Sequence, residues 1–265
     1  LKNIGKALKH RLVEEGKSVR FVPLKDNERT LSSASVEHNK LLAENGVEFV
    51  LLSDEKRTLI GVTAEVQAFE EYSRRDWDRP QRDMDVGLLP PKLAQMMINC
   101  AGLSHNKHLK IVDPFCGFGT ILQEALLLGY TNTWGSDLNQ EMVTASKKNL
   151  AWLTQEKDLP YNPGHITACD ARNLSRIHKP SSINAIVTEP YLGPVRTKKT
   201  TLQNLSPIIS SLSALYSGFL KEVRPILKDN GSIVMVWPVW LSRGEQTFLP
   251  LYEKLAALGY AAEKI

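Results

Sequence analysis

The sequence predicts an α/β protein built around a mostly parallel sheet. Two observations support this: from about residue 88 onward, short apolar runs alternate with segments of helical spacing, and successive apolar runs end in an acid. Strands that alternate with helices pack as parallel βα units, with helices on both faces of the sheet. We expect this larger domain over residues 88–265, a small α/β domain over residues 1–70 and a linker over residues 71–87.

Helical and strand-like segments alternate in the small domain. Apolar residues at helical spacing predict a helix in residues 1–15, and a serine start with a glycine stop predicts another in residues 33–46. Strands are expected at residues 19–23, 47–54 and 58–66, the last two joined by a polar turn.

In the larger domain, five strands are expected to alternate with helices. The expected strands are residues 109–113, 131–137, 165–170, 183–189 and 231–240. The expected helices begin near Pro91 or cover residues 119–129, 140–153, about 206–228 and 248–259. Right-handed crossovers place the carboxyl ends of such strands along one edge of the sheet, where ligands bind.

Composition narrows the possible functions without choosing one. The chain has 42% hydrophobic and 23% charged residues, and no apolar run approaches the length that crosses a bilayer. Its three cysteines lack metal-ligand spacing, so we expect free thiols in the cytoplasm and no metal site. A net charge of +4 permits a polyanionic partner but does not demand one.

The Gly-rich turn at residues 113–120, DPFCGFGT, predicts a small-molecule cofactor site at the end of the first strand of the repeat. A nicotinamide dinucleotide fits poorly, because Leu122 stands where its fingerprint needs a small residue. Asp113 and Glu124 would also place negative charge near its pyrophosphate. A P-loop is excluded because no Gly-Lys-Ser/Thr follows the turn.

S-adenosylmethionine suits the site better, because it has no phosphate and carries a positive sulfonium and amino group. Asp113, Asp137 and Asp170 close three successive strands. We expect Asp113 near the amino acid moiety, Asp137 on the ribose hydroxyls and Asp170 on the adenine amine. The full set expected to bind the cofactor is Asp113, Phe115, Cys116, Gly117, Gly119, Thr120, Asp137, Leu138, Asp170 and Ala171.

The fourth strand of this repeat leads into a candidate catalytic turn, Glu189-Pro190-Tyr191. An exocyclic base amine is a poor nucleophile, because its lone pair is delocalised into the ring. A side-chain oxygen and a rigid backbone carbonyl can accept its two N–H groups and aim the lone pair. Glu189 and Pro190 would supply these acceptors, and Tyr191 could stack on a flipped base. The alternative is a turn with a chance acid.

Basic residues lie on both sides of this site in the sequence. Those that could contact RNA phosphates are Arg74, Arg75, Arg79, Arg82, Lys92, Arg196, Lys198 and Lys199. In the linker, four acids alternate with the arginines, so internal ion pairs are an equal alternative. The last three residues could equally belong to a solvated loop.

The sequence resembles the THUMP-associated tRNA guanine methyltransferases, which modify the guanine exocyclic amine. The linker and first helix at residues 74–99 carry this resemblance, together with residues 113–129, 135–150 and 168–174. It implies a class I, Rossmann-like S-adenosylmethionine-dependent methyltransferase domain that acts on RNA, with tRNA the expected partner. Residues 1–70 resemble the later part of a THUMP unit, which in the family helps to grip the tRNA acceptor end.

The sequence departs from the family pattern at the catalytic turn and at the carboxyl-terminal end. The usual tetrad is Asp-Pro-Pro-Tyr, whereas this chain has Glu189-Pro190-Tyr191-Leu192. We also expect the closing antiparallel hairpin of the fold to be missing, and the chain to be a piece of a longer protein. A methyltransferase for DNA or ribosomal-RNA amines, or a non-catalytic RNA-binding protein that keeps the fold, therefore remains an alternative.

Overall fold

The computed structural model describes residues 2–24, 28–83, 87–103, 106–194, 205–242 and 245–263. These residues divide into two compact units, one up to Ser73 and one from Arg74 onward. The first unit corresponds to the small α/β region, and the second contains the parallel sheet.

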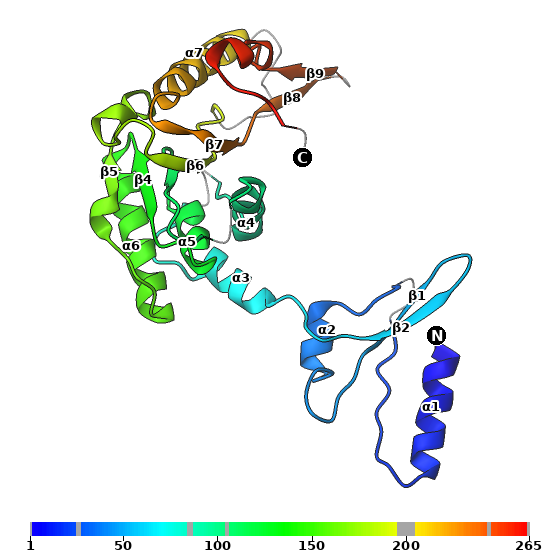
Figure 1. The fold of residues 1–265 in the computed structure, drawn as a ribbon. Coiled ribbons are helices and arrows are strands. Elements are labelled where there is room, and N and C mark those ends of the chain that lie inside the picture. Colours follow the sequence, from blue (N-terminus) through cyan, green and yellow to red (C-terminus); the bar gives the residue numbers. More distant parts are fainter. Residues whose placement is uncertain are drawn as a thin grey trace. The chain divides into compact units, whose positions relative to one another are not determined.

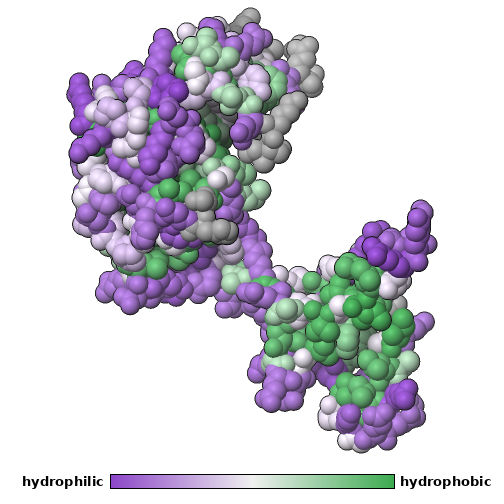
Figure 2. Space-filling view, in the orientation of Figure 1, coloured by the Kyte–Doolittle hydropathy of each residue, from purple (hydrophilic) through white to green (hydrophobic). Residues whose placement is uncertain are grey.

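The small unit contains two helices and a β-hairpin (Figure 1). Helix α1 spans Lys2–Glu14, α2 spans Ser33–His38, and strands β1 (Phe49–Ser53) and β2 (Thr58–Val62) pair antiparallel. Residues 19–23 do not form the expected strand, and α2 is shorter than expected because Lys40 has a left-handed backbone, with φ of 55°. Figure 2 shows hydrophobic surface on this unit, where Phe49, Leu52 and Ile60 are exposed.

Helix α3 (Phe69–Trp77) occupies the first part of the expected linker. The prediction of an aperiodic linker was therefore wrong for these residues. The helix was not recognised because its arginines and acids show no apolar periodicity. The buried side chain of α3 is that of an arginine, Arg75, and not that of an apolar residue. Arg75 is buried in the second unit although it is charged, so hydrophobic periodicity does not mark it as a buried residue.

The second unit contains a five-stranded parallel sheet in the order β5-β4-β3-β6-β7 (Figure 1). Its strands are β3 (Ile111–Asp113), β4 (Thr133–Asp137), β5 (Ile166–Ala168), β6 (Ile183–Thr188) and β7 (Leu227–Met235). The chain adds β4 and β5 on one side of β3, then returns to place β6 on the other side. Such a reversal of strand order opens a crevice at the carboxyl ends of the strands.

Helices cover both faces of this sheet. The helices are α4 (Pro91–Cys100), α5 (Thr120–Leu127), α6 (Gln140–Lys157) and α7 (Leu205–Val223). Ile111 packs in a buried cluster with α4 and α5, whereas the next residue, Val112, packs in a cluster with α7. Successive strand side chains point to opposite faces, and both faces are covered here, which explains why Ile111 and Val112 are both apolar.

The carboxyl-terminal region differs from the prediction in two ways. The strand expected at residues 231–240 is split: β7 ends at Met235, and β8 (Val239–Ser242) pairs antiparallel with β9 (Glu245–Phe248) in a separate hairpin. Pro238 lies in the break, where it can donate no ladder hydrogen bond. The helix expected at residues 248–259 is replaced by two short 3-10 helices, η4 (Tyr252–Lys254) and η5 (Ala256–Leu258).

Candidate active site

A single cavity of about 910 Å³ lies at the carboxyl ends of β3, β4 and β6. It is lined by residues expected to bind the cofactor, among them Asp113, Asp137 and Asp170, and by residues of the candidate catalytic turn, among them Glu189. Every residue that the sequence analysis assigned to the cofactor lines it except Gly119, the residue just before α5. The four acids expected to converge thus share one cavity, while their individual roles stay predictions.

Asp113 closes β3 and is only 2% exposed. One carboxylate oxygen, Oδ1, accepts hydrogen bonds from the Thr188 hydroxyl at 2.6 Å and from the Phe115 backbone N–H at 3.2 Å. Burial raises the pKa of Asp113 to about 7, although these two hydrogen bonds act in the opposite direction. The acid therefore connects the ends of β3 and β6 beneath the cavity.

The Gly-rich turn has the left-handed backbone that explains its glycines. Gly117 and Gly119 have φ of 49° and 81°. A Cβ at Gly119 would lie 2.4 Å from the Ser146 Oγ, so this position also needs the space. The Gly117 N–H donates a hydrogen bond to Asp137 Oδ2 across 3.0 Å, which fixes the turn against the end of β4.

Asp137 closes β4 with both carboxylate oxygens engaged. Oδ2 accepts from Gly117, and Oδ1 accepts from the Asn139 N–H at 2.9 Å. Each oxygen retains acceptor capacity, because a carboxylate oxygen has two lone pairs. The side chain is thus held in one orientation at the cavity wall. Beside it, Leu138 is 74% exposed and also lines the cavity.

Asp170 lies two residues beyond the end of β5 and begins the 3-10 helix η2 (Ala171–Arg176). Its Oδ2 pairs with Arg172 Nη2 at 2.6 Å, and this hydrogen-bonded pairing lowers the pKa of Asp170. Arg172 lines the cavity too, and the sequence analysis missed it. The only available signal was a basic residue two positions after an acid, which is too common to be informative.

The candidate catalytic turn follows β6 directly. Glu189 is half-buried, and burial raises its pKa. Pro190 is buried, whereas Tyr191 is 55% exposed. The hydroxyl of Tyr216, on α7, donates a hydrogen bond to the Tyr191 carbonyl. This anchor, like Arg172, was not predicted from the sequence.

The basic residues expected to contact RNA separate into different groups. Arg75 and Arg79 are 7% and 3% exposed, so their assignment to RNA phosphates was wrong for this structure. Arg74 pairs with Glu156 at 2.8 Å and remains partly exposed, and Arg82 lies over the Trp77 ring. Lys92 is exposed at the start of α4. Arg196, Lys198 and Lys199 lie outside the described residues.

Arg75 forms a buried ion pair inside the second unit. Its Nε donates to Glu124 Oε1 at 2.6 Å, and Gln95 Nε2 donates to Glu124 Oε2 at 2.6 Å. This cluster joins α3, α4 and α5. Glu124 therefore has a packing role, and its burial raises its pKa against the effect of Arg75.

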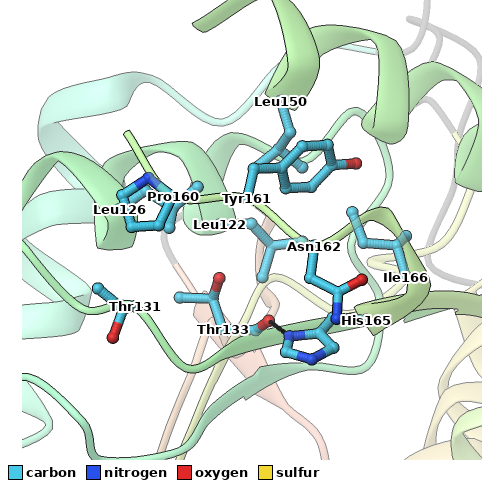
Figure 3. A pocket seen from close by; sticks show the side chains of 10 residues that line it. All are labelled: Leu122, Leu126, Thr131, Thr133, Leu150, Pro160, Tyr161, Asn162, His165 and Ile166. Atoms are coloured by element: carbon cyan, nitrogen blue, oxygen red, sulfur yellow. Dashed lines mark hydrogen bonds between the residues drawn. The ribbon is translucent and has the colours of Figure 1, made fainter. Parts of the chain in front are cut away.

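A second hollow lies next to α5 and α6, away from the carboxyl ends of β3 and β6. Figure 3 shows Leu122, Tyr161 and His165 around it, with the His165 Nδ1–H donating to the Thr133 carbonyl. Its volume is about 10 Å³, enough for about one water molecule and no more.

Within the described part of the chain, no cluster of His, Cys, Asp or Glu could hold a metal, and no helix is long and apolar enough to cross a membrane.

The strand order, the acid-lined cavity and a matching family profile together define the class of this domain: a class I S-adenosylmethionine-dependent methyltransferase domain. The chain belongs to the family described as RMKL-like, methyltransferase domain, whose sequence profile matches residues 79–240. The matched region begins at the buried Arg79 and contains all of the parallel sheet.

The chain is also similar to curated proteins whose names state an activity. The chain is 32% identical over 155 residues to a tRNA (guanine(10)-N2)-dimethyltransferase of Methanothermobacter thermautotrophicus, covering 58% of this chain and 40% of the relative. A protein of the same name from Methanocaldococcus jannaschii is 27% identical over 171 residues, covering 63% and 43%. The chain thus spans about two fifths of the length of these relatives.

Among solved structures, the chain is similar to TrmN from Thermus thermophilus. The sequence identity is 18% and the TM-score 0.47, covering 76% of this chain and 57% of the other.

The cavity fits S-adenosylmethionine in size and charge. About 910 Å³ lies within the range of small-molecule pockets. Carboxylates at the strand ends suit a ligand with a positive sulfonium and amino group. Thr120, which lines the cavity, accepts a hydrogen bond from the buried Arg79, whose Nε and Nη2 have no hydrogen-bond partner.

Proposed function

We propose that this protein methylates an exocyclic base amine of RNA, specifically guanine in tRNA. The observation that supports this is the position of Glu189 and Pro190 in the wall of the same cavity as Asp113, Asp137 and Asp170. The names of the curated relatives suggest the guanine amine and tRNA. A cytoplasmic location is part of the same proposal.

The cofactor would be held by residues at the ends of three strands. Asp137, whose carboxylate is held by the N–H groups of Gly117 and Asn139, would accept from the ribose hydroxyls, and the exposed Leu138 would contact the adenine. Asp170 would accept from the adenine amine, although its pairing with Arg172 leaves it fewer free lone pairs. When bound, S-adenosylmethionine supplies an electrophilic methyl group at this site.

Glu189 and Pro190 would present the base amine. The ionised Glu189 carboxylate accepts one amine N–H and the Pro190 carbonyl accepts the other, which localises the nitrogen lone pair. Their contribution is positioning and electrostatics, since neither forms a covalent bond to the substrate. Tyr191 is exposed beside them and can stack on a base that has left its helix.

Exposed basic residues would hold the RNA backbone near this cavity. Arg82 and Lys92 belong to this set, and Arg74 contributes if its pair with Glu156 opens. Arg196, Lys198 and Lys199 remain predictions from the sequence. Phosphate contacts of this kind position a polyanion and make binding depend on salt.

The test is methyl transfer from labelled S-adenosylmethionine to purified tRNA, ribosomal RNA and duplex DNA by the full-length protein. We expect label in tRNA, and none when Glu189→Ala replaces the wild type. Label in DNA or ribosomal RNA alone would assign a different substrate. Cofactor binding without transfer to any nucleic acid would indicate a non-catalytic RNA-binding protein.

A further inference from the structure

The edge of the sheet opposite the cavity, where β3, β4, β5 and β6 begin, carries basic side chains. Four segments lead into these strands: residues 106–110, 129–132, 159–165 and 177–182. They contain no Asp or Glu, and their basic residues are Lys107, His108, Lys110, His165, His178 and Lys179. The carboxyl ends of the same strands carry the four acids of the cavity. The two edges of the sheet therefore differ in charge.

Lys107 is held in place by an aromatic ring. Its Nζ lies 4.1 Å from the centroid of the Tyr130 ring, and Tyr130 is only 5% exposed. The lysine stem passes close to Gly129, where a Cβ would lie 3.7 Å from Lys107 Cγ. A cation–π contact of this kind orients the ammonium group without neutralising its charge.

Lys110 is held in a similar way by Trp134 and His178. Its Nζ lies 4.3 Å from the centroid of the Trp134 ring and donates a hydrogen bond to His178 Nδ1 at 3.0 Å. Burial lowers the pKa of His178 to about 4, so this imidazole is neutral near pH 7 and can accept the bond. The other ring close to Trp134 is His165, which stacks on it with centroids 3.8 Å apart. Neither partner of Lys110 supplies a negative charge.

Lys179 adds an exposed lysine beside this cluster. The Ser182 hydroxyl donates to the Lys179 carbonyl at 2.6 Å, which fixes the backbone before β6. Within the described residues, none of the three lysines forms an ion pair or hydrogen bond with a carboxylate. Asp158 ends α6 next to the third segment and pairs with none of them. Their charges are thus left for an external anion.

We propose that this basic edge, defined by Lys107, Lys110 and Lys179, binds the phosphate backbone of the RNA substrate at a distance from the methylation cavity. The inference rests on the proposed function for the identity of the polyanion. Strand β4 has five residues, so at about 3.3 Å per residue its two ends lie roughly 17 Å apart. One folded RNA can contact both edges. Such contacts orient the RNA and make binding depend on salt, but they do not read its sequence.

The test measures the binding of labelled tRNA to the full-length protein over a series of salt concentrations. The variant is Lys107→Gln with Lys179→Gln, which leaves the half-buried Lys110 and its bond to His178 in place. We expect tRNA binding to weaken roughly tenfold at about 150 mM salt, and the slope of log Kd against log salt to fall by about 2. Exchanging the same two lysines for arginine keeps both charges and should keep the slope.

The matched control is Lys147→Gln with Lys148→Gln on α6. This pair has the same charge change, and its side chains are half-buried and exposed like those of Lys107 and Lys179. The control should retain the wild-type slope, and all variants should bind S-adenosylhomocysteine as the wild type does, which shows that they are folded.

Equal losses in the two glutamine variants would overturn the inference. An unchanged slope in Lys107→Gln with Lys179→Gln would also overturn it and would leave the edge to an acidic protein partner. If the wild type methylates tRNA while that slope is unchanged, only this inference fails. If the slope falls as expected but the wild type methylates no RNA, only the proposed function fails.

Discussion

The Tyr216 hydroxyl donates a hydrogen bond to the Tyr191 carbonyl across 3.1 Å, from the middle of α7 to the candidate catalytic turn. Tyr216 is fully buried, and its ring meets Trp237 edge to face. The same helix contacts the end of the turn, because a Cβ at Gly193 would lie 3.2 Å from Ile208 Cγ2. Helix α7 thus fixes the backbone on which Glu189 and Pro190 depend.

We therefore expect Tyr216→Phe to lower kcat for RNA methylation by about tenfold, on the order of one hydrogen bond, while the affinity for S-adenosylhomocysteine stays unchanged. Tyr260→Phe is the control, because the Tyr260 hydroxyl also donates to a backbone carbonyl of α7, that of Leu220, away from the turn. Hydrogen exchange over residues 189–194 should accelerate in Tyr216→Phe alone. Equal kinetic losses in both variants would show a general effect on stability.

Asp137 and Glu189 should separate cofactor binding from transfer. Asp137→Ala removes the acceptor expected to hold the ribose and also releases the Gly117 N–H, so the affinity for S-adenosylhomocysteine should fall at least about tenfold. Glu189→Ala should leave that affinity near normal and abolish transfer. Calorimetry and single-turnover methylation measure the two effects. Full turnover by Glu189→Ala would remove the residue from catalysis.

The raised pKa of Glu189 predicts the pH dependence of transfer. The ionised carboxylate is a stronger hydrogen-bond acceptor for an amine N–H than the protonated acid, so kcat should rise with pH through a pKa above that of an ordinary glutamate. Glu189→Gln keeps an acceptor oxygen that does not titrate, so its residual rate should lack this acidic limb. The profile is measured at saturating cofactor, because the nearby Asp113 also has a raised pKa. An identical limb in Glu189→Gln would assign it to another group.

Arg75 and Arg74 are adjacent arginines whose removal should lower stability by very different amounts. The side chains of Arg75 and its partner Glu124 are 8% and 1% exposed, so Arg75→Ala leaves a buried carboxylate without its ion pair. We expect a loss of about 3–5 kcal/mol in the free energy of unfolding. Arg74→Ala should cost less than about 1 kcal/mol, since that side chain is 45% exposed. Denaturant unfolding would contradict this account if the two losses were equal.

The sequence predicted the βα pattern well, because short strand segments that end in an acid alternate with segments of helical spacing. It also predicted that Asp113, Asp137, Asp170 and Glu189 would share one edge, since parallel strands place their carboxyl ends together. These inferences follow from local pattern and topology alone.

The arginines show where sequence reasoning stops. Arg75 and Arg79 look the same in the sequence as Arg74 and Arg82, because each of the four stands among acids. The packing of α3 and the turn after it against α5 buries Arg75 and Arg79. This packing joins residues far apart in the sequence, so no local sequence pattern predicts it. Tyr216 was missed for a similar reason, since its hydrogen bond joins residues 25 positions apart. The hairpin of β8 and β9 was missed because the apolar residues on both sides of Pro238 look like one continuous strand, whereas β7 ends before this proline and β8 begins after it.

The most direct test of the central claim is mass spectrometry of nucleosides from tRNA treated with the full-length protein and S-adenosylmethionine. The account predicts guanosine methylated on its exocyclic amine, present with the wild type and absent with Glu189→Ala. Methylation of another atom, or no methylated nucleoside from a protein that binds the cofactor, would contradict it.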